Sequence, residues 1–180
     1  MRSTQELVEE HRIIEGVLRA LARRLDDAGR THQVPVEFLR NLIAFSRVFV
    51  DRCHHAKEER CLFPCLESRG IPRDGGPIGV MLQEHERGRT LVRQIAERLD
   101  RYERGDAGVD DVLEPCRRYV ELLQQHILKE NAVLFPMGYQ VMADHDDEQI
   151  RQCYEGQEHE MGGGEHARLI GLAEAMSAEA

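Results

Sequence analysis

The sequence predicts an all-α protein: an antiparallel up-down-up-down four-helix bundle followed by a short C-terminal helical extension. Apolar residues recur at helical spacing along nearly every long segment, and no run alternates convincingly with period two, as a strand would. Four of these segments, of roughly 25 to 35 residues, are joined by short loops, and short loops favour antiparallel neighbours. We therefore assign residues 1–142 to the bundle and residues 143–180 to the extension.

Each predicted helix has recognisable ends. The first begins with Ser3 as N-cap of a Ser-Thr-Gln-Glu capping box, and its apolar stripe leads to Gly29, a residue type that often ends helices. Prolines in the first turn and glycines beyond the last turn mark the others. These are expected over residues 35–68, 77–104 and 109–142.

Two matched prolines and a glycine run shape the rest of the chain. Pro64 and Pro136 each fall late in a predicted helix, where proline removes a backbone hydrogen bond, so we expect both helices to kink alike. Three glycines at residues 162–164 break the tail before a short amphipathic helix over residues 165–176. That tail is too short to bury a core of its own, so we expect it to dock on the bundle.

Composition narrows the class of protein. The chain has 180 residues, 41% of them hydrophobic and 32% charged, which is typical of one globular domain. No apolar run approaches the ~20 residues of a membrane span, and residues 1–10 do not resemble a signal peptide. A net charge of −9 argues against nucleic acid or an anionic membrane as partner, whereas nine histidines suit a bound cation. We expect a cytoplasmic protein, and a homodimer is left open.

The five cysteines do not predict a disulfide framework. Their number is odd and the chain is not a small secreted scaffold, so we interpret all five as reduced thiols. Cys61 and Cys65 lie one helical turn apart and could bind a soft metal. No second cysteine pair accompanies them, so this signal is weak.

The most informative feature is an eleven-residue repeat. Residues 54–64 and 126–136 both read His-x-x-Lys-Glu-x-x-x-Leu-Phe-Pro. The repeat places His54 and Glu58, and again His126 and Glu130, four residues apart on one helix face. Charged pairs at this spacing are common on exposed helix surfaces, but repetition of the whole pattern in one register favours metal ligation.

The register of the first pair has an alternative. His55 and Glu59 share the same spacing, but the second copy has no counterpart to them, so we place His55 outside the ligand set, either behind the ligands or exposed. The other two helices each offer one histidine within an apolar stripe, His11 and His85. Such residues are often ordinary core histidines, yet here they complete a cage of four histidines and two glutamates.

For several neighbouring residues the sequence leaves more than one role open. Glu15 could be a ligand or a carboxylate that accepts a hydrogen bond from Arg89, and Tyr119 could bond a metal-bound oxygen, although packing is the simpler interpretation. In the tail, His159, Glu165 and His166 could reach a metal or cap the bundle, but surface exposure is favoured.

These motifs resemble those of the bacterial hemerythrin-like, or HHE cation-binding, domain proteins. The resemblance covers roughly residues 3–142 and implies a four-helix bundle that holds two non-haem iron ions bridged by carboxylates and often by an oxo or hydroxo group. It carries over the ligands His11, His54, Glu58, His85, His126 and Glu130. The matching segments are Glu10-His11-Arg12, His54-His55-x-x-Glu58-Glu59-x-x-Leu62-Phe63-Pro64, Glu84-His85-Glu86 and His126-x-x-Lys129-Glu130-x-x-x-Leu134-Phe135-Pro136.

One departure bears on function. Arg89 stands where oxygen-carrying hemerythrins have a second histidine on the third helix, and arginine cannot ligate. An open coordination position favours reaction over reversible O₂ storage. The resemblance then implies binding or reduction of a small diatomic or peroxide ligand (O₂, H₂O₂ or NO), in redox or nitrosative stress or iron handling. Peroxidase-like, catalase-like or NO-reducing activity, and a sensing or iron-storage module without turnover, are the alternatives.

Overall fold

The computed structural model describes residues 1–162 and 164–178, and every regular element among them is a helix, so the all-α prediction is confirmed. Four helical rods come first. The first is α1 (Arg2–Thr31) and the third is α4 (Pro77–Glu103). The second and fourth mix α-helix with wider π-helix. They consist of α2 (Val36–Phe45), η1 (Ser46–His55), η2 (Glu58–Leu62) and α3 (Phe63–Ser68), and of α5 (Val109–Lys129), η3 (Glu130–Leu134) and α6 (Phe135–Val141).

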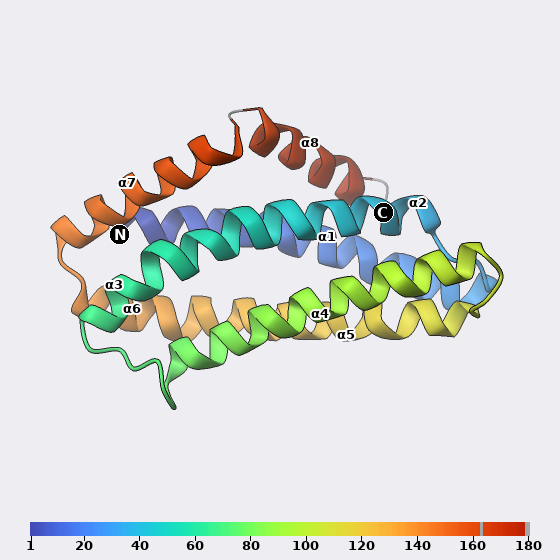
Figure 1. Cartoon of the computed structure of the whole chain (residues 1–180), viewed down its shortest axis with the longest axis horizontal. Coiled ribbons are helices and arrows are strands. Elements are labelled where there is room, and N and C mark those ends of the chain that lie inside the picture. The colour runs from blue at the N-terminus through green and yellow to red at the C-terminus, as the bar shows by residue number, and fades with distance from the viewer. Residues whose placement is uncertain (163, 179–180) are drawn as a thin grey trace.

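The tail forms two more helices, α7 (Asp144–Met161) and α8 (Glu165–Ala178). Figure 1 shows them running along one side of the molecule, where they pack on α1 and on the second rod. Leu169, Ala173 and Met176 of α8 are buried in the main apolar core. Burial of a side chain such as Leu169 stabilises the docked tail by about 2 kcal/mol.

The predicted start of the first helix is wrong. The helix begins at Arg2, so Ser3 lies inside it and is not the N-cap. The free backbone N–H groups of Arg2 and Ser3 each donate to a carboxylate oxygen of Asp147, at 3.0 Å. A side chain from α7 therefore caps α1, which no local pattern could indicate. The helix also continues past Gly29 to Thr31, and its C-cap residue His32 adopts the left-handed conformation itself.

The matched prolines interrupt their helices in the same way, whereas the expected kinks stay a prediction. A five-residue π-helix precedes each one, η2 before Pro64 and η3 before Pro136. A proline ring crowds the carbonyl four residues earlier and provides no N–H to it. The wider π turn relieves this conflict and lets the helix continue. Both π segments begin at a predicted ligand, Glu58 or Glu130.

Two apolar cores enclose a layer of buried polar side chains, which we call the polar belt. The larger core extends from the belt toward the α2 end of the rods, and the smaller one includes Leu62, Phe63 and Phe135. Each rod passes from one core through the belt into the other. The belt consists of Glu10, His11, His54, His55, Lys57, Glu58, Glu84, His85, His126 and Glu130. No helix in the described part of the chain is long and apolar enough to cross a membrane.

Candidate metal centre

Seven buried side chains from all four rods converge in the polar belt. They form two groups that could each hold a cation, and within a group the potential ligand atoms all lie within 4.8 Å of one another. All seven residues are buried, with at most 3% of their surface exposed. The first group is His11, His54, Glu58 and Glu130, and the second is His55, Glu58, His85 and His126.

The two carboxylates lie between the groups. One oxygen of Glu58 is 3.7 Å from His54 Nε2, and the other is 3.4 Å from His85 Nε2. A single oxygen of Glu130 is 3.2 Å from His11 Nε2 and 3.3 Å from His126 Nε2. Each carboxylate therefore contacts one imidazole from either side, which is the position of a bridging ligand.

The outer nitrogens of four imidazoles are all held by oxygen acceptors. His54 Nδ1 is 2.8 Å from Glu10, and His126 Nδ1 is 3.1 Å from Glu84. The other two contacts join His11 Nδ1 to the Asn131 amide oxygen at 2.9 Å and His85 Nδ1 to Glu59 at 2.8 Å. Because these oxygens only accept, each Nδ1 carries the proton and each Nε2 keeps its lone pair for a cation.

The inner atoms lack partners that a cation would provide. Among the described residues, His11 Nε2, His54 Nε2 and all four carboxylate oxygens of Glu58 and Glu130 are buried without a hydrogen bond. The lone pairs of His85 Nε2 and His126 Nε2 face each other at 3.2 Å. Ligand atoms bind such ions at about 2.0–2.2 Å, so two ligands of one ion lie within about 4.4 Å. These residues fit a bound cation.

Burial makes the two bridging carboxylates unequal. Burial and the neighbouring charge of Glu130 raise the pKa of Glu58 well above its ordinary value. Burial also acts on Glu130, but His126 and His11 outweigh it and lower the pKa of that carboxyl. A cation beside the two carboxylates would favour the charged form of both.

Two lysines fix the acidic partners of the histidines. Lys57 Nζ, fully buried, donates to Glu10 at 2.7 Å, to Glu6 at 2.7 Å and to Glu158 of α7 at 2.6 Å. Lys129 donates to Glu84 in the corresponding place of the second repeat. Each repeat therefore supplies a lysine that orients the glutamate holding its own histidine.

The model for the hemerythrin HHE cation-binding domain matches residues 2–138 of this chain. The chain belongs to the hemerythrin HHE family. Similar curated proteins are uncharacterized proteins of Mycobacterium tuberculosis and Mycobacterium bovis, 24% identical over 156 residues, which make up 86% of this chain. The matched region is 60% of the relatives' own length. No solved structure matches the chain.

All six residues expected as ligands of this hemerythrin-family chain lie together in the belt, in the two groups described above. Whether they bind metal stays a prediction. His55 was placed outside the set, yet it is buried and belongs to the second group, with its ring stacked on that of His85 at 3.7 Å.

The π-helix explains why sequence reasoning missed His55. In a regular α-helix two successive side chains point about 100° apart, so His54 and His55 would not both face one centre. The ten-residue π segment η1 ends at His55 and has more residues per turn, which brings both side chains inward. The doubled histidine was the available signal, but Ile127 at the matching position of the second repeat argued against it.

The neighbouring residues have other contacts. Arg89 pairs with Asp51 and Glu59 rather than with Glu15, which belongs to no candidate group among the described residues. Tyr119 donates to Ser46 at 3.0 Å. In the tail, His159 is exposed as expected. His166 is half-buried, and its Nε2 lies 3.9 Å from Glu10, so the expectation of surface exposure is wrong for this residue.

The cysteine expectation also needs correction. Cys61 and Cys153 form a disulfide that joins η2 to α7, so they are not reduced thiols. They are 92 residues apart in sequence, and only the docking of the tail brings them together. Cys53, Cys65 and Cys116 are free thiols. With Cys61 in a disulfide, the Cys61–Cys65 pair cannot bind a soft metal.

Proposed function

We propose that this protein holds two non-haem iron ions in the polar belt and binds or reduces a small oxidant there (O₂, H₂O₂ or NO). The observation that carries the proposal is the uniform arrangement of four histidines. Each has its outer nitrogen fixed by an oxygen acceptor and its inner nitrogen directed at two buried, unpartnered carboxylates. Solvated surface residues have no reason to adopt this arrangement.

Each ion would have its own imidazoles and share the carboxylates. His11 and His54 would hold the first ion, and His85, His126 and His55 the second, with Glu58 and Glu130 between them. Bound iron supplies one-electron redox chemistry between its ferrous and ferric states. The chain's own contribution is to orient the imidazoles through Glu10, Asn131, Glu59 and Glu84, and to keep bulk water out with an apolar core on either side.

The proposal includes the architecture. We assign residues 1–142 to an antiparallel up-down-up-down four-helix bundle that holds the metal, and residues 143–180 to an extension that covers one side of it. The order of the cores supports this. The smaller core precedes the belt along the first and third rods and follows it along the second and fourth, as opposite rod directions require.

Metal analysis and visible spectroscopy of aerobically purified protein test the proposal. We expect about two irons per chain and an absorption spectrum that changes on addition of dithionite and then of peroxide. His54→Ala and Glu130→Ala should each lower bound iron, because each removes a ligand. His159→Ala, which changes an exposed histidine away from the belt, is the matched control and should retain it.

Full iron retention in both ligand variants would refute the ligand assignment. Consumption of peroxide or NO by the iron-loaded protein would identify an enzyme. Spectral changes without turnover would instead identify a binding or sensing module.

A further inference from the structure

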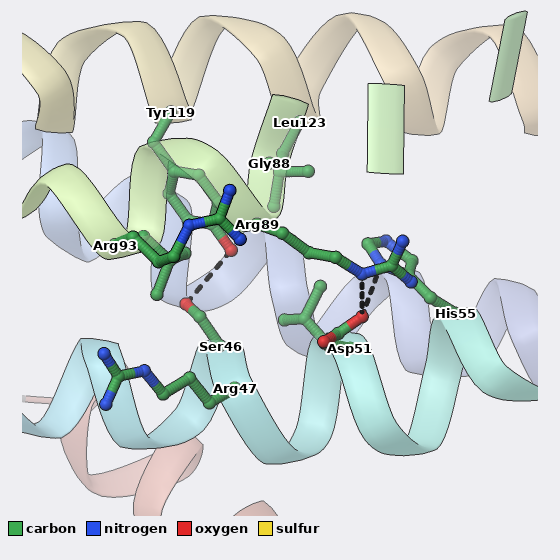
Figure 2. Close-up of a pocket in the computed structure, with 11 residues that line it drawn as sticks. Ser46, Arg47, Asp51, His55, Gly88, Arg89, Arg93, Tyr119 and Leu123 are labelled. Carbon is green, nitrogen blue, oxygen red and sulfur yellow. Dashed lines mark hydrogen bonds and ion pairs between the residues drawn. The ribbon is translucent and has the colours of Figure 1, made fainter. Parts of the chain in front are cut away.

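A small cavity of about 180 Å³ lies beside the second group of the belt (Figure 2). Residues of the π-helix η1, from Ser46 to His55, form one wall. Residues 88–93 of α4 form the opposite wall, and Tyr119 and Leu123 of α5 contribute the rest of the lining. The π segment that turns His55 inward therefore also shapes this cavity.

The cavity contains a buried polar atom that makes no hydrogen bond. His55 is 3% exposed, and its Nδ1 has no hydrogen bond among the described residues. That nitrogen lies 3.8 Å from Asp51 Oδ1, too far for a hydrogen bond but on the side of the ring where Asp51 lines the cavity, as Figure 2 shows. A buried polar atom of this kind costs about 1–3 kcal/mol unless a ligand or water forms a hydrogen bond with it.

The charges around the cavity do not cancel. Arg89 is neutralised by Asp51 and Glu59, each at 2.7 Å. Exposed Arg47, at the rim, makes no hydrogen bond or ion pair with any other described residue. Buried apolar side chains also line the cavity, namely Val50, Val92 and Leu123.

We propose that this cavity binds a small organic monoanion, a carboxylate with a compact apolar body. The valine and leucine side chains suit the body, and Arg47 at the rim suits the negatively charged head. The cavity volume of about 180 Å³ suits such a ligand, because a cavity of about 150 Å³ holds a benzene molecule. A doubly charged anion would find only one arginine that is not already paired. A much larger anion would not fit the available volume.

The site goes beyond the proposed oxidant chemistry, yet it touches the same belt. His55 belongs both to the cavity and to the second group. Arg89, another lining residue, holds Glu59, which in turn holds His85. A bound carboxylate therefore contacts the surroundings of the second group and none of the first. Its binding needs no cation, so the test below holds whatever the metal analysis shows.

Calorimetric titration of the full chain with sodium benzoate tests the proposal. We expect one saturable site and at least about tenfold weaker binding of neutral benzamide, since a charge-assisted hydrogen bond contributes more than 1.4 kcal/mol. Gly88→Val should weaken benzoate binding by about tenfold or more. A Cβ at Gly88 would meet only Leu122 within 4 Å, so the backbone leaves room for the start of a side chain at this lining position.

Matched variants separate the cavity from general effects. Gly156→Val also adds a valine to a helix in open space, but on α7, and should leave benzoate binding unchanged. Arg47→Met should weaken binding by about three- to tenfold, whereas Arg23→Met, at an exposed position of α1, should not. If Gly88→Val does not fold, Val92→Phe fills the same cavity.

Three results would overturn the proposal. The first is no saturable benzoate binding up to about 10 mM. The second is equal affinity for benzoate and benzamide, which would remove the role of the charge. The third is unchanged affinity in the cavity-filling variants, which would place the ligand elsewhere.

Discussion

The first copy of the repeat is covered by α7, whereas the second copy faces solvent. Lys57 is fully buried under Glu158 of α7, while the side chain of its counterpart Lys129 is 38% exposed. Cys61 is bonded to Cys153, while its counterpart Val133 is 49% exposed. The same ligand pair is thus held in two different surroundings.

The difference separates the contacts that both copies share from those that the tail adds. Both lysines donate to the glutamate that holds the histidine of their own repeat, so that contact belongs to the site. Only the first copy has the extra glutamates, the disulfide and the covering helix. The benzoate cavity proposed above adjoins the second group through His55.

The largest expected effect comes from removing the buried lysine. Lys57→Met removes the cation beside buried Glu10, which keeps its hydrogen bond with His54, and should lower the free energy of unfolding by about 3–5 kcal/mol. Lys129→Met, at the matching exposed position, should cost about 1 kcal/mol or less. Urea denaturation of the two variants measures both values. Equal losses would mean that the cover of α7 does not distinguish the two copies.

The disulfide should have the next largest effect. Cys153→Ser frees α7 from η2 and should lower the free energy of unfolding by about 2–4 kcal/mol, because the crosslink restricts a long unfolded segment. Cys65→Ser, which removes a free and partly exposed thiol nearby, is the matched control and should cost much less. Denaturation with and without reductant measures the effect. A wild-type curve that reductant does not shift would contradict the prediction.

The acid stability of the two copies should differ as well. Although burial opposes it, contacts with His54 and Lys57 lower the pKa of Glu10 from 4.5 to about 2. A lowered pKa in the folded state stabilises the protein above pH 4.5, and this stability, about 3 kcal/mol, is lost as the pH falls toward 2. Glu84 is shifted in the same direction by His126 and Lys129, but it is less enclosed.

Unfolding curves recorded from pH 6 to pH 2 would measure this. Glu10→Gln should reduce the loss in free energy of unfolding between pH 6 and pH 2, and Glu84→Gln should reduce it less. Release of a cation by acid affects both variants and wild type, so the comparison between them removes that contribution. A larger effect at Glu84 would reverse the assignment of the covered and open copies.

The sequence predicted what local patterns determine. Pro77, Gly105 and Gly108 set the ends of α4 and α5, because proline and glycine restrict the backbone wherever they occur. The repeat brought His54, Glu58, His126 and Glu130 together, since residues four apart share a helix face. The inward histidines on the other two rods followed from their apolar stripes.

The remainder depends on contacts between distant segments. Whether residues 46–55 form α-helix or π-helix decides the direction of His55, and no local pattern specifies it. The disulfide needs Cys153 of the tail beside Cys61, and the cap of α1 needs Asp147 beside Arg2. All three are consequences of packing, so a single sequence could not provide them.

The smallest effect is expected on the uncovered face of the second copy. Leu128 is 57% exposed, whereas Ala56 at the matching position of the first copy is 8% exposed. Leu128→Gln should change the free energy of unfolding by no more than about 0.5 kcal/mol, while Ala56→Gln should cost about 1–3 kcal/mol because the site has no room. A loss above about 1 kcal/mol for Leu128→Gln that grows with protein concentration would show that a second copy covers this face in solution. In that case both copies of the repeat would be covered, one by the chain's own tail and the other by its partner.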